Sequence, residues 1–160
     1  MVRADPLQSI FLMLTICVPA AWYEWFPDFS QDFIGIEFQP GENVTLTVTA
    51  TSLTSGNATI INTTTGQNVT HVFAGRPELC QENAEWIVED FAVGGDLVPF
   101  ANFTSVNFTS ALATMNNGTT VGPREATIIE ITQHNELLTD VQTTNDSVAV
   151  TYVGTAGSTV

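Results

Sequence analysis

Apolar and polar residues alternate along much of the chain after residue 20. In residues 44–50, apolar side chains stand at every even position and threonine at every odd one. Successive side chains of a strand point to opposite faces, so this pattern predicts a half-buried β-strand. Other short runs are rich in β-branched residues, namely NATIIN, NVTHVFA, AEWIVEDF, NFTSVNFT, ATIIEIT and SVAVTYV. We therefore expect many short strands.

Turn-forming residues separate these runs, and no apolar stripe with helical spacing occurs. The turns contain Gly, Asn, Ser or Pro and lie at residues 54–57, 65–67, 94–96, 116–118 and 121–123. Short strands at such spacing predict an all-β sandwich or barrel. The length of 160 residues favours one domain.

Two of the runs mix carboxylates with large apolar side chains. The first is NAEWIVEDF, residues 83–91, and the second is AWYEWFPDF, residues 21–29. In an extended strand one face of the first run would carry Glu85, Ile87, Glu89 and Phe91, and the other Trp86, Val88 and Asp90. Burying an ionised carboxylate is costly, so such a mixture points to a use for the carboxylates. The aromatic cluster of the second run fits either a core or a groove for extended peptide or sugar.

The charge of the chain is strongly negative. There are 17 acidic residues, no lysine and only three arginines, which gives a formal net charge of -14. This balance excludes nucleic acid as a partner and disfavours an anionic membrane surface, because both need clustered Lys or Arg. Two interpretations stay open: a protein adapted to acidic surroundings, where the repulsion is titrated away, and an ordinary acidic protein kept soluble by its charge.

The chain has features of a secreted glycoprotein. Residues 1–20 combine a charged start, a short apolar run and small residues before a cleavage position after Ala20, as in a signal peptide. Eight glycosylation sequons begin at Asn43, Asn57, Asn62, Asn68, Asn102, Asn107, Asn117 and Asn145. Chance alone would create some of these in an Asn- and Thr-rich chain. Cys17 and Cys80 lack metal-type spacing, and they can pair only if residue 17 survives processing.

Most catalytic signatures are absent from the sequence. It contains no G-x-S-x-G, P-loop, G-x-G-x-x-G, H-E-x-x-H or Asp-Thr/Ser-Gly motif. His71 and His134 are isolated, so we interpret both as surface or strand histidines and expect no metal site. No cofactor is expected either.

Five segments occur in an order that resembles a known family. They are AWYEWFPDF, GQNVTHVF, CQENAEWIVEDF, LVPFANF and ATIIEI, and they span about Ala21 to Val153. Together they resemble the glutamic endopeptidases, or eqolisins, which are secreted fungal acid peptidases insensitive to pepstatin. The resemblance implies an antiparallel β-sandwich of the concanavalin A-like lectin and glucanase type. It also implies a polypeptide substrate, a monomer and an extracellular location.

The resemblance implies roles for particular residues. The Glu of the family's A-E-W motif is the catalytic acid and base, and it corresponds to Glu85. Beside Trp86 this carboxyl should be desolvated, which favours its protonated form. The W-Y-E-W aromatics of the family help to form the substrate cleft, which makes Trp22, Tyr23 and Trp25 expected substrate-binding residues. The family uses neither a metal nor a covalent acyl-enzyme.

The sequence departs from the family at its start. The family's second catalytic residue is a glutamine upstream of the W-Y-E-W block, in a Q-T-G-V-D-like stretch that does not occur here. Residues 1–20 stand where the family has its opening strands. We therefore expect the sandwich to lack those opening strands. Three accounts stay open: a signal peptide on a shortened chain, a wrongly joined gene start, or Gln8 as a diverged catalytic residue.

We therefore expect a leader in residues 1–20, an eqolisin-like sandwich in 21–153 and a tail in 154–160. The expected function is acid endopeptidase activity, in which Glu85 activates water and a glutamine stabilises the oxyanion. The alternative is a secreted, catalytically incomplete sandwich that binds peptide or glycan.

Overall fold

The structure is a computed structural model that describes residues 10–15, 20–90 and 92–155. These residues form β-strands and one short 3-10 helix, η1 (Pro123–Glu125), so the all-β prediction is confirmed. No helix among them is long and apolar enough to cross a membrane. The chain divides into two compact units, an N-terminal unit up to Glu82 and a C-terminal unit from Asn83 onwards.

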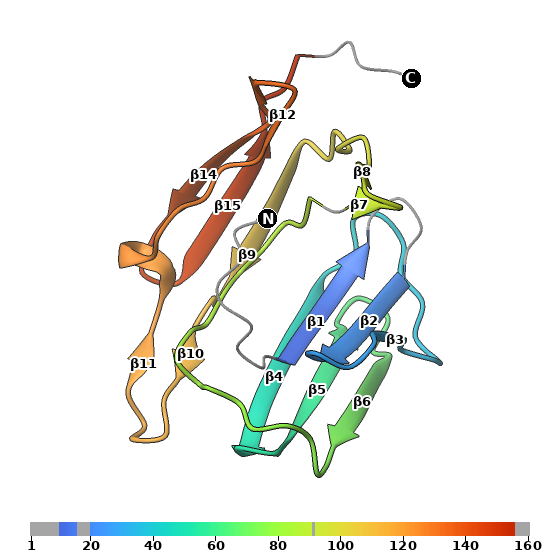
Figure 1. The fold of residues 1–160 in the computed structure, drawn as a ribbon, viewed down its shortest axis with the longest axis vertical. Helices are drawn as coiled ribbons and strands as arrows, with labels where there is room; N and C mark the ends of the chain where they lie inside the picture. The colour runs from blue at the N-terminus through green and yellow to red at the C-terminus, as the bar shows by residue number, and fades with distance from the viewer. Residues whose placement is uncertain (1–9, 16–19, 91, 156–160) are drawn as a thin grey trace. The chain divides into compact units, whose positions relative to one another are not determined.

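The N-terminal unit contains two three-stranded antiparallel sheets (Figure 1). The first sheet consists of β1 (Ile10–Thr15), β2 (Ala20–Trp25) and β3 (Gln31–Asp32). The second consists of β4 (Val44–Ser52), β5 (Ser55–Asn62) and β6 (Asn68–Phe73). Short turns join the strands of the second sheet, as the sequence predicts.

The two sheets of this unit pack face to face around one apolar core. Ala21 and Trp25 of β2 contact a cluster that includes Ala58 and Ile60 of β5 and Phe73 of β6. On β5, the central strand, buried residues alternate with partly exposed ones along its whole length. This period of two is the signature of a strand with one face on a core. The predicted β-sandwich is therefore present.

The edge strand β4 is more exposed than its sequence predicts. The prediction of a half-buried strand is wrong here, because Leu46 and Val48 are 39% and 43% exposed. Their register opposite Ile60 and Ala58 puts them on the core face. β4 is an edge strand of its sheet, with β5 as its one neighbour.

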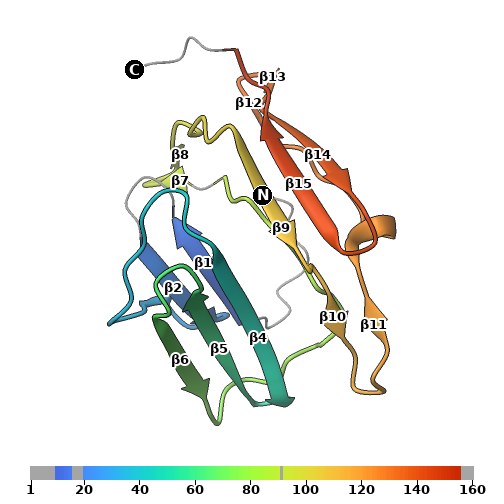
Figure 2. The same cartoon turned by 180° about the vertical axis from the view of Figure 1, so that it is seen from behind.

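The C-terminal unit is built on a three-stranded antiparallel sheet with the order β14–β15–β9 (Figure 2). Its strands are β9 (Ser105–Thr109), β14 (Thr139–Thr143) and β15 (Ser147–Tyr152). Three small hairpins accompany it: β7 (Ala92–Val93) with β8 (Asp96–Leu97), β10 (Ala113–Thr114) with β11 (Thr120–Val121), and β12 (Thr132–Gln133) with β13 (Glu136–Leu137).

The predicted strand ATIIEIT is realised only at its last residue, in β12. Residues 126–131 form no strand, and side chains supply hydrogen bonds at the last two of these residues, Glu130 and Ile131. The Glu130 carboxylate accepts hydrogen bonds from the Thr139 hydroxyl at 2.7 Å and from the Val141 N–H at 2.9 Å. The Thr139 hydroxyl oxygen in turn accepts one from the Ile131 N–H at 2.8 Å.

The predicted leader and tail are described only in part. Residues 10–15 pair with β2 as strand β1, in antiparallel register. At the other end, Thr155 donates through its N–H and hydroxyl to Oε1 of Glu136, at 2.5 and 2.7 Å. Residues 1–9, 16–19 and 156–160 lie outside the described residues. The boundaries 1–20, 21–153 and 154–160 therefore stay predictions.

Candidate functional site

The segment from Asn83 to Asp90 presents its side chains alternately to the core and to solvent. Trp86 and Val88 are half-buried and pack against the core of the C-terminal unit, formed by Ala111, Val148 and Val150. Glu85 and Glu89, on the opposite side, are exposed. The alternation predicted for these residues is confirmed.

This segment is nevertheless not a strand, and that part of the prediction is wrong. Residues 74–90 form no β-strand. Trp86 and Val88 lie on the apolar face of the β14–β15–β9 sheet and not at its edge. A segment that lies on a face has no neighbouring strand with which to share a hydrogen-bond ladder.

Glu85 itself does not have the environment that the sequence predicts. Desolvation by Trp86 was expected, but the Glu85 side chain is exposed, while Trp86 points to the other side of the backbone. That expectation is wrong. The consequence for chemistry is favourable, because an exposed carboxyl on a fixed backbone is accessible to water and to a substrate.

Asp90 is the polar member of the inward-facing side of the segment. Its Oδ1 accepts a hydrogen bond of 2.8 Å from Nε2 of Gln133, a residue only 8% exposed. The same Nε2 donates to the carbonyl oxygen of Val98 at 3.0 Å. Glu89 is exposed as a residue, but partial desolvation of its carboxyl and the negative charge of Asp90 raise its pKa above the ordinary value.

The aromatic residues of β2 divide between two faces of their sheet. Trp25 is 1% exposed and donates from Nε1 to the carbonyl oxygen of Pro77 at 3.0 Å. Tyr23 lies on the same face, and its ring packs edge-on against Phe33 with 4.8 Å between centroids. Trp22 is on the other face, directly opposite Asp32 of β3. The three expected substrate-binding residues therefore do not share one surface.

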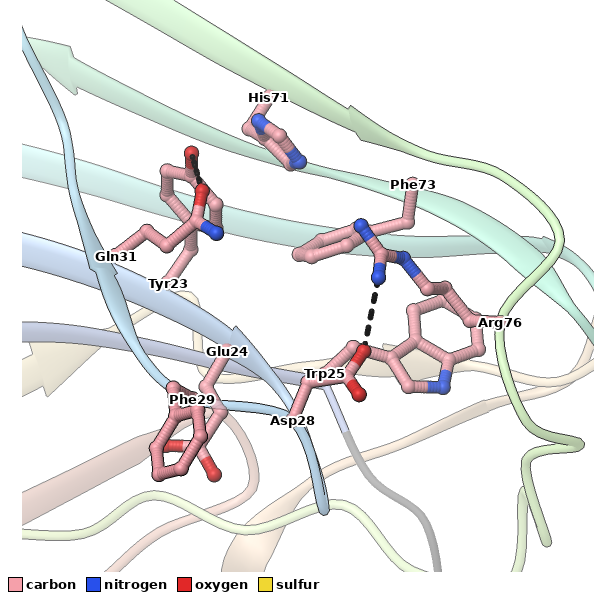
Figure 3. Close-up of a pocket in the computed structure, with 9 residues that line it drawn as sticks. All are labelled: Tyr23, Glu24, Trp25, Asp28, Phe29, Gln31, His71, Phe73 and Arg76. Carbon is pink, nitrogen blue, oxygen red and sulfur yellow. Dashed lines mark hydrogen bonds and ion pairs between the residues drawn. The ribbon is translucent and has the colours of Figure 1, made fainter.

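A small pocket lies in the N-terminal unit, between residues of β2, β6 and the segments that follow them (Figure 3). The Tyr23 hydroxyl donates to Oε1 of Gln31 at 3.1 Å, and the ring of Tyr23 stacks on His71. Arg76 and Asp28 form an ion pair of 2.9 Å, drawn as a dashed line in Figure 3. The full lining comprises Tyr23, Glu24, Trp25, Asp28, Phe29, Gln31, His71, Phe73 and Arg76.

Sequence reasoning missed Arg76, the place of His71 in the pocket, and Gln133. His71 shares a face of β6 with Val69 and Phe73, so strand alternation alone could have put it beside the core. Its assignment as a strand histidine is confirmed, and His134 lies in the turn between β12 and β13. No local signal marks Gln133, whose partner Asp90 is 43 residues away. The described residues contain no group of three metal-ligating side chains.

Two residues of the predicted chemistry lie outside the described residues. Gln8, the weak candidate for the oxyanion donor, precedes residue 10, and Cys17 falls in the gap between residues 15 and 20. Cys80 is exposed. Its pairing with Cys17 and the role of Gln8 stay predictions.

Comparison with known proteins gives a consistent result. Residues 18–152 match the sequence model of the Peptidase A4 family. Aspergillopepsin-2 of Aspergillus niger is 54% identical over 135 residues, a match that covers 83% of this chain and 48% of that protein. Scytalidopepsin B of Scytalidium lignicola is 42% identical over 142 residues, with 83% and 54% covered. The chain thus spans about half the length of the curated relatives it matches.

Solved structures show the same relationship in three dimensions. The crystal structure of aspergilloglutamic peptidase from Aspergillus niger superposes with a TM-score of 0.79 at 48% identity, covering 90% of this chain and 86% of that one. Scytalido-glutamic peptidase with a transition state analog inhibitor gives a TM-score of 0.78 at 39% identity, covering 85% and 70%. The resemblance to the eqolisins is therefore confirmed: the chain belongs to the Peptidase A4 family.

Proposed function

We propose that this chain is an acid endopeptidase of the glutamic type and that Glu85 is its catalytic carboxyl. The observation that carries the proposal is the opposite orientation of two neighbours: Trp86 is anchored in the core, and Glu85 faces solvent from the same short segment. Membership of the Peptidase A4 family supports this assignment.

In the proposed reaction Glu85 acts first as a base and then as an acid. It takes a proton from a water molecule, whose oxygen attacks the carbonyl carbon of the scissile peptide bond. The tetrahedral intermediate then collapses, the C–N bond breaks, and Glu85 returns the proton to the leaving amine. A side-chain amide would stabilise the oxyanion by donating a hydrogen bond to it. Gln8 is the candidate in this sequence.

The proposed substrate is a polypeptide, and we assign its contacts on β2 by orientation. Trp22 is only partly buried and faces away from the core, so it would contact the substrate directly. Tyr23 lines the pocket of the N-terminal unit and could contact a substrate there. Trp25 is buried, so it would support the site by holding β2 in position. A secreted, monomeric protein is part of the same proposal.

The test is digestion of casein by the full chain at about pH 3, a pH at which most free carboxyls are protonated, with pepstatin present. Glu85→Gln should abolish cleavage, since it removes the only group proposed to handle the proton. Glu82→Gln is the matched control, because Glu82 is also exposed and lies three residues earlier. Cleavage that survives Glu85→Gln would refute the proposed role of this residue. Binding of casein without cleavage by the unaltered chain would favour the non-catalytic alternative.

The donor of the oxyanion hydrogen bond can be tested in the same assay. Gln8→Ala should lower turnover by about 10²- to 10³-fold, as loss of one oxyanion donor does in other hydrolases. Unchanged turnover in that variant would show that Gln8 is not the donor.

A further inference from the structure

Gln133 joins two points of the chain that flank the β7–β8 hairpin. Its Nε2 donates to Asp90 just before the hairpin and to the carbonyl oxygen of Val98 just after it, at 2.8 and 3.0 Å. One amide nitrogen carries two hydrogens, so both bonds can form at once. The side chain is almost fully buried, which shields these bonds from competition by water.

The hydrogen bond from Gln133 to Asp90 completes the attachment of the Glu85 segment to the C-terminal unit. Trp86, Val88 and Asp90 occur at alternate positions and all face inward. The first two are held by apolar packing, which has no preferred direction. The bond from Gln133 to Asp90 is directional, and it therefore constrains rotation of the segment about its own axis.

We infer that Gln133 is a positioning residue for Glu85, acting through Asp90. This inference rests on the proposed function for its catalytic meaning. A Gln133 that merely fills space would need only its shape, whereas a positioning Gln133 needs its hydrogen bond to Asp90. The two alternatives predict different results when the amide of residue 133 is replaced by a carboxyl, which can be neutral or charged depending on pH.

Several ionisable groups lie on the segments that this bond joins. Glu89 is the neighbour of Asp90 in sequence and feels its charge. The hairpins that Gln133 joins also carry Asp96 on β8, Glu136 on β13 and His134 in the β12–β13 turn. Because most of these groups are acidic, a new negative charge at position 133 would be opposed from several sides.

The decisive variant is Gln133→Glu, which keeps the size of the side chain and changes its donors. Two carboxyls at hydrogen-bond distance cannot both ionise cheaply, but they can share one proton in acid. The bond to Asp90 should therefore survive at about pH 3 and be replaced by repulsion at about pH 7. Gln133→Met, which has no donor at any pH, should lose the bond throughout.

The first readout is amide hydrogen exchange of residues 83–98, measured by mass spectrometry and compared with the unaltered chain at the same pH. Gln133→Glu should exchange about tenfold or more faster near pH 7 but close to normally near pH 3, the scale expected for a charged hydrogen bond. Gln142→Glu is the matched control, because the exposed Gln142 also donates to an aspartate, Asp140, at 3.2 Å. It should leave exchange of residues 83–98 unchanged.

The second readout is the pH profile of casein cleavage. In Gln133→Glu the neutral side of the profile should shift to lower pH, while the profile of Gln142→Glu stays in place. If neither the unaltered chain nor any variant cleaves casein, the proposed function is refuted. Hydrogen exchange would still test the role of Gln133 in that case. The two failures are therefore distinguishable.

An exchanged pair gives the final check. In the double variant Gln133→Glu with Asp90→Asn, the new amide can donate to the new carboxylate, so protection near pH 7 should recover. If Gln133→Glu does not fold at either pH, recovery of folding by the double variant supports the inference, and its absence overturns it. Equal exchange of the unaltered chain and Gln133→Glu at neutral pH would also overturn it.

Discussion

The rings of Tyr23 and His71 stack almost in parallel, with 3.9 Å between their centroids and 16° between their planes. Burial in this stack, together with the positive charge of Arg76, lowers the pKa of His71 from its ordinary value of 6.5. A histidine of lowered pKa binds its proton more readily in the unfolded chain. Its contribution to stability is therefore present above pH 6.5 and is lost as the pH falls through the folded-state pKa.

We predict that His71→Phe stabilises the protein in acid more than at neutral pH. Phenylalanine keeps an aromatic ring for the stack but cannot be protonated. The gain in melting temperature at about pH 4 should exceed the gain at about pH 8 by around 2 °C, less than 1 kcal/mol of unfolding free energy in a chain of this size. His134→Phe, in an exposed turn, is the control and should show no such difference. Equal gains at both pH values for His71→Phe would contradict the prediction.

A second prediction concerns Glu89, whose pKa is raised by partial burial and by the charge of Asp90. A carboxyl of raised pKa stabilises the fold fully below its unfolded-state pKa, and this contribution is lost as the pH rises through the folded value. Glu89→Gln should therefore raise the melting temperature at about pH 7, by no more than about 4 °C for a partly exposed group. It should have little effect at about pH 3. A larger gain in acid than at neutral pH would reverse the sign and refute the argument.

The behaviour of the Glu85 segment illustrates how far sequence can predict this site. Alternation of side chains is a local property of an extended backbone, so the opposite orientations of Glu85 and Trp86 could be predicted correctly. Whether the segment joins the hydrogen-bond ladder of a sheet depends on whether another strand lies beside it. The local sequence pattern contains no information about that neighbour. The strand assignment failed for that reason, and so did the predicted desolvation of Glu85.

The same distinction holds elsewhere in the molecule. Alternation alone places Trp22 on one face of β2 and Tyr23 and Trp25 on the other. Which of these two faces is buried depends on the sheet that packs against β2, and the local sequence does not specify it. The bond between Gln133 and Asp90 joins residues 43 positions apart and has no sequence signature. The presence of strands β4 and β5 could be predicted from their sequences, but only β5 has the alternating burial that the pattern of β4 predicts.

A third prediction concerns the whole chain. With a formal net charge of -14, repulsion should weaken the fold at neutral pH, so the melting temperature should peak on the acid side. Glu136 opposes this trend, because hydrogen bonds from Thr155 lower its pKa, and its contribution is lost as the pH falls through the folded value. The maximum should therefore lie in mild acid. A melting temperature that rises steadily from about pH 4 to about pH 8 would contradict the prediction.

The last prediction concerns Asn62, which is fully buried although it begins a glycosylation sequon. Its Nδ2 donates to the carbonyl oxygen of Glu37 at 3.1 Å and to Oε2 of Glu42 at 2.7 Å. Its Oδ1 accepts hydrogen bonds from the N–H groups of Thr64 and Thr65 at 3.1 and 3.2 Å. Every polar atom of this side chain is thus engaged: Oδ1 organises the turn between β5 and β6, and Nδ2 ties that turn to residues 37–42.

Because a glycan would attach to Nδ2, the folded protein should carry no sugar at Asn62. Enzymatic deglycosylation in heavy-oxygen water, followed by mass spectrometry, should never label this residue, whatever the occupancy of exposed sequons such as Asn107. Asn62→Ala should also lower the unfolding free energy by roughly 2–4 kcal/mol, since it leaves the N–H groups of Thr64 and Thr65 without their acceptor and removes one of the donors to the Glu42 carboxylate. Asn107→Ala removes a sequon from an exposed position and should change stability by less than about 0.5 kcal/mol. A glycan found on Asn62 of the folded protein, or equal stability of the two alanine variants, would show that this side chain does not hold the turn.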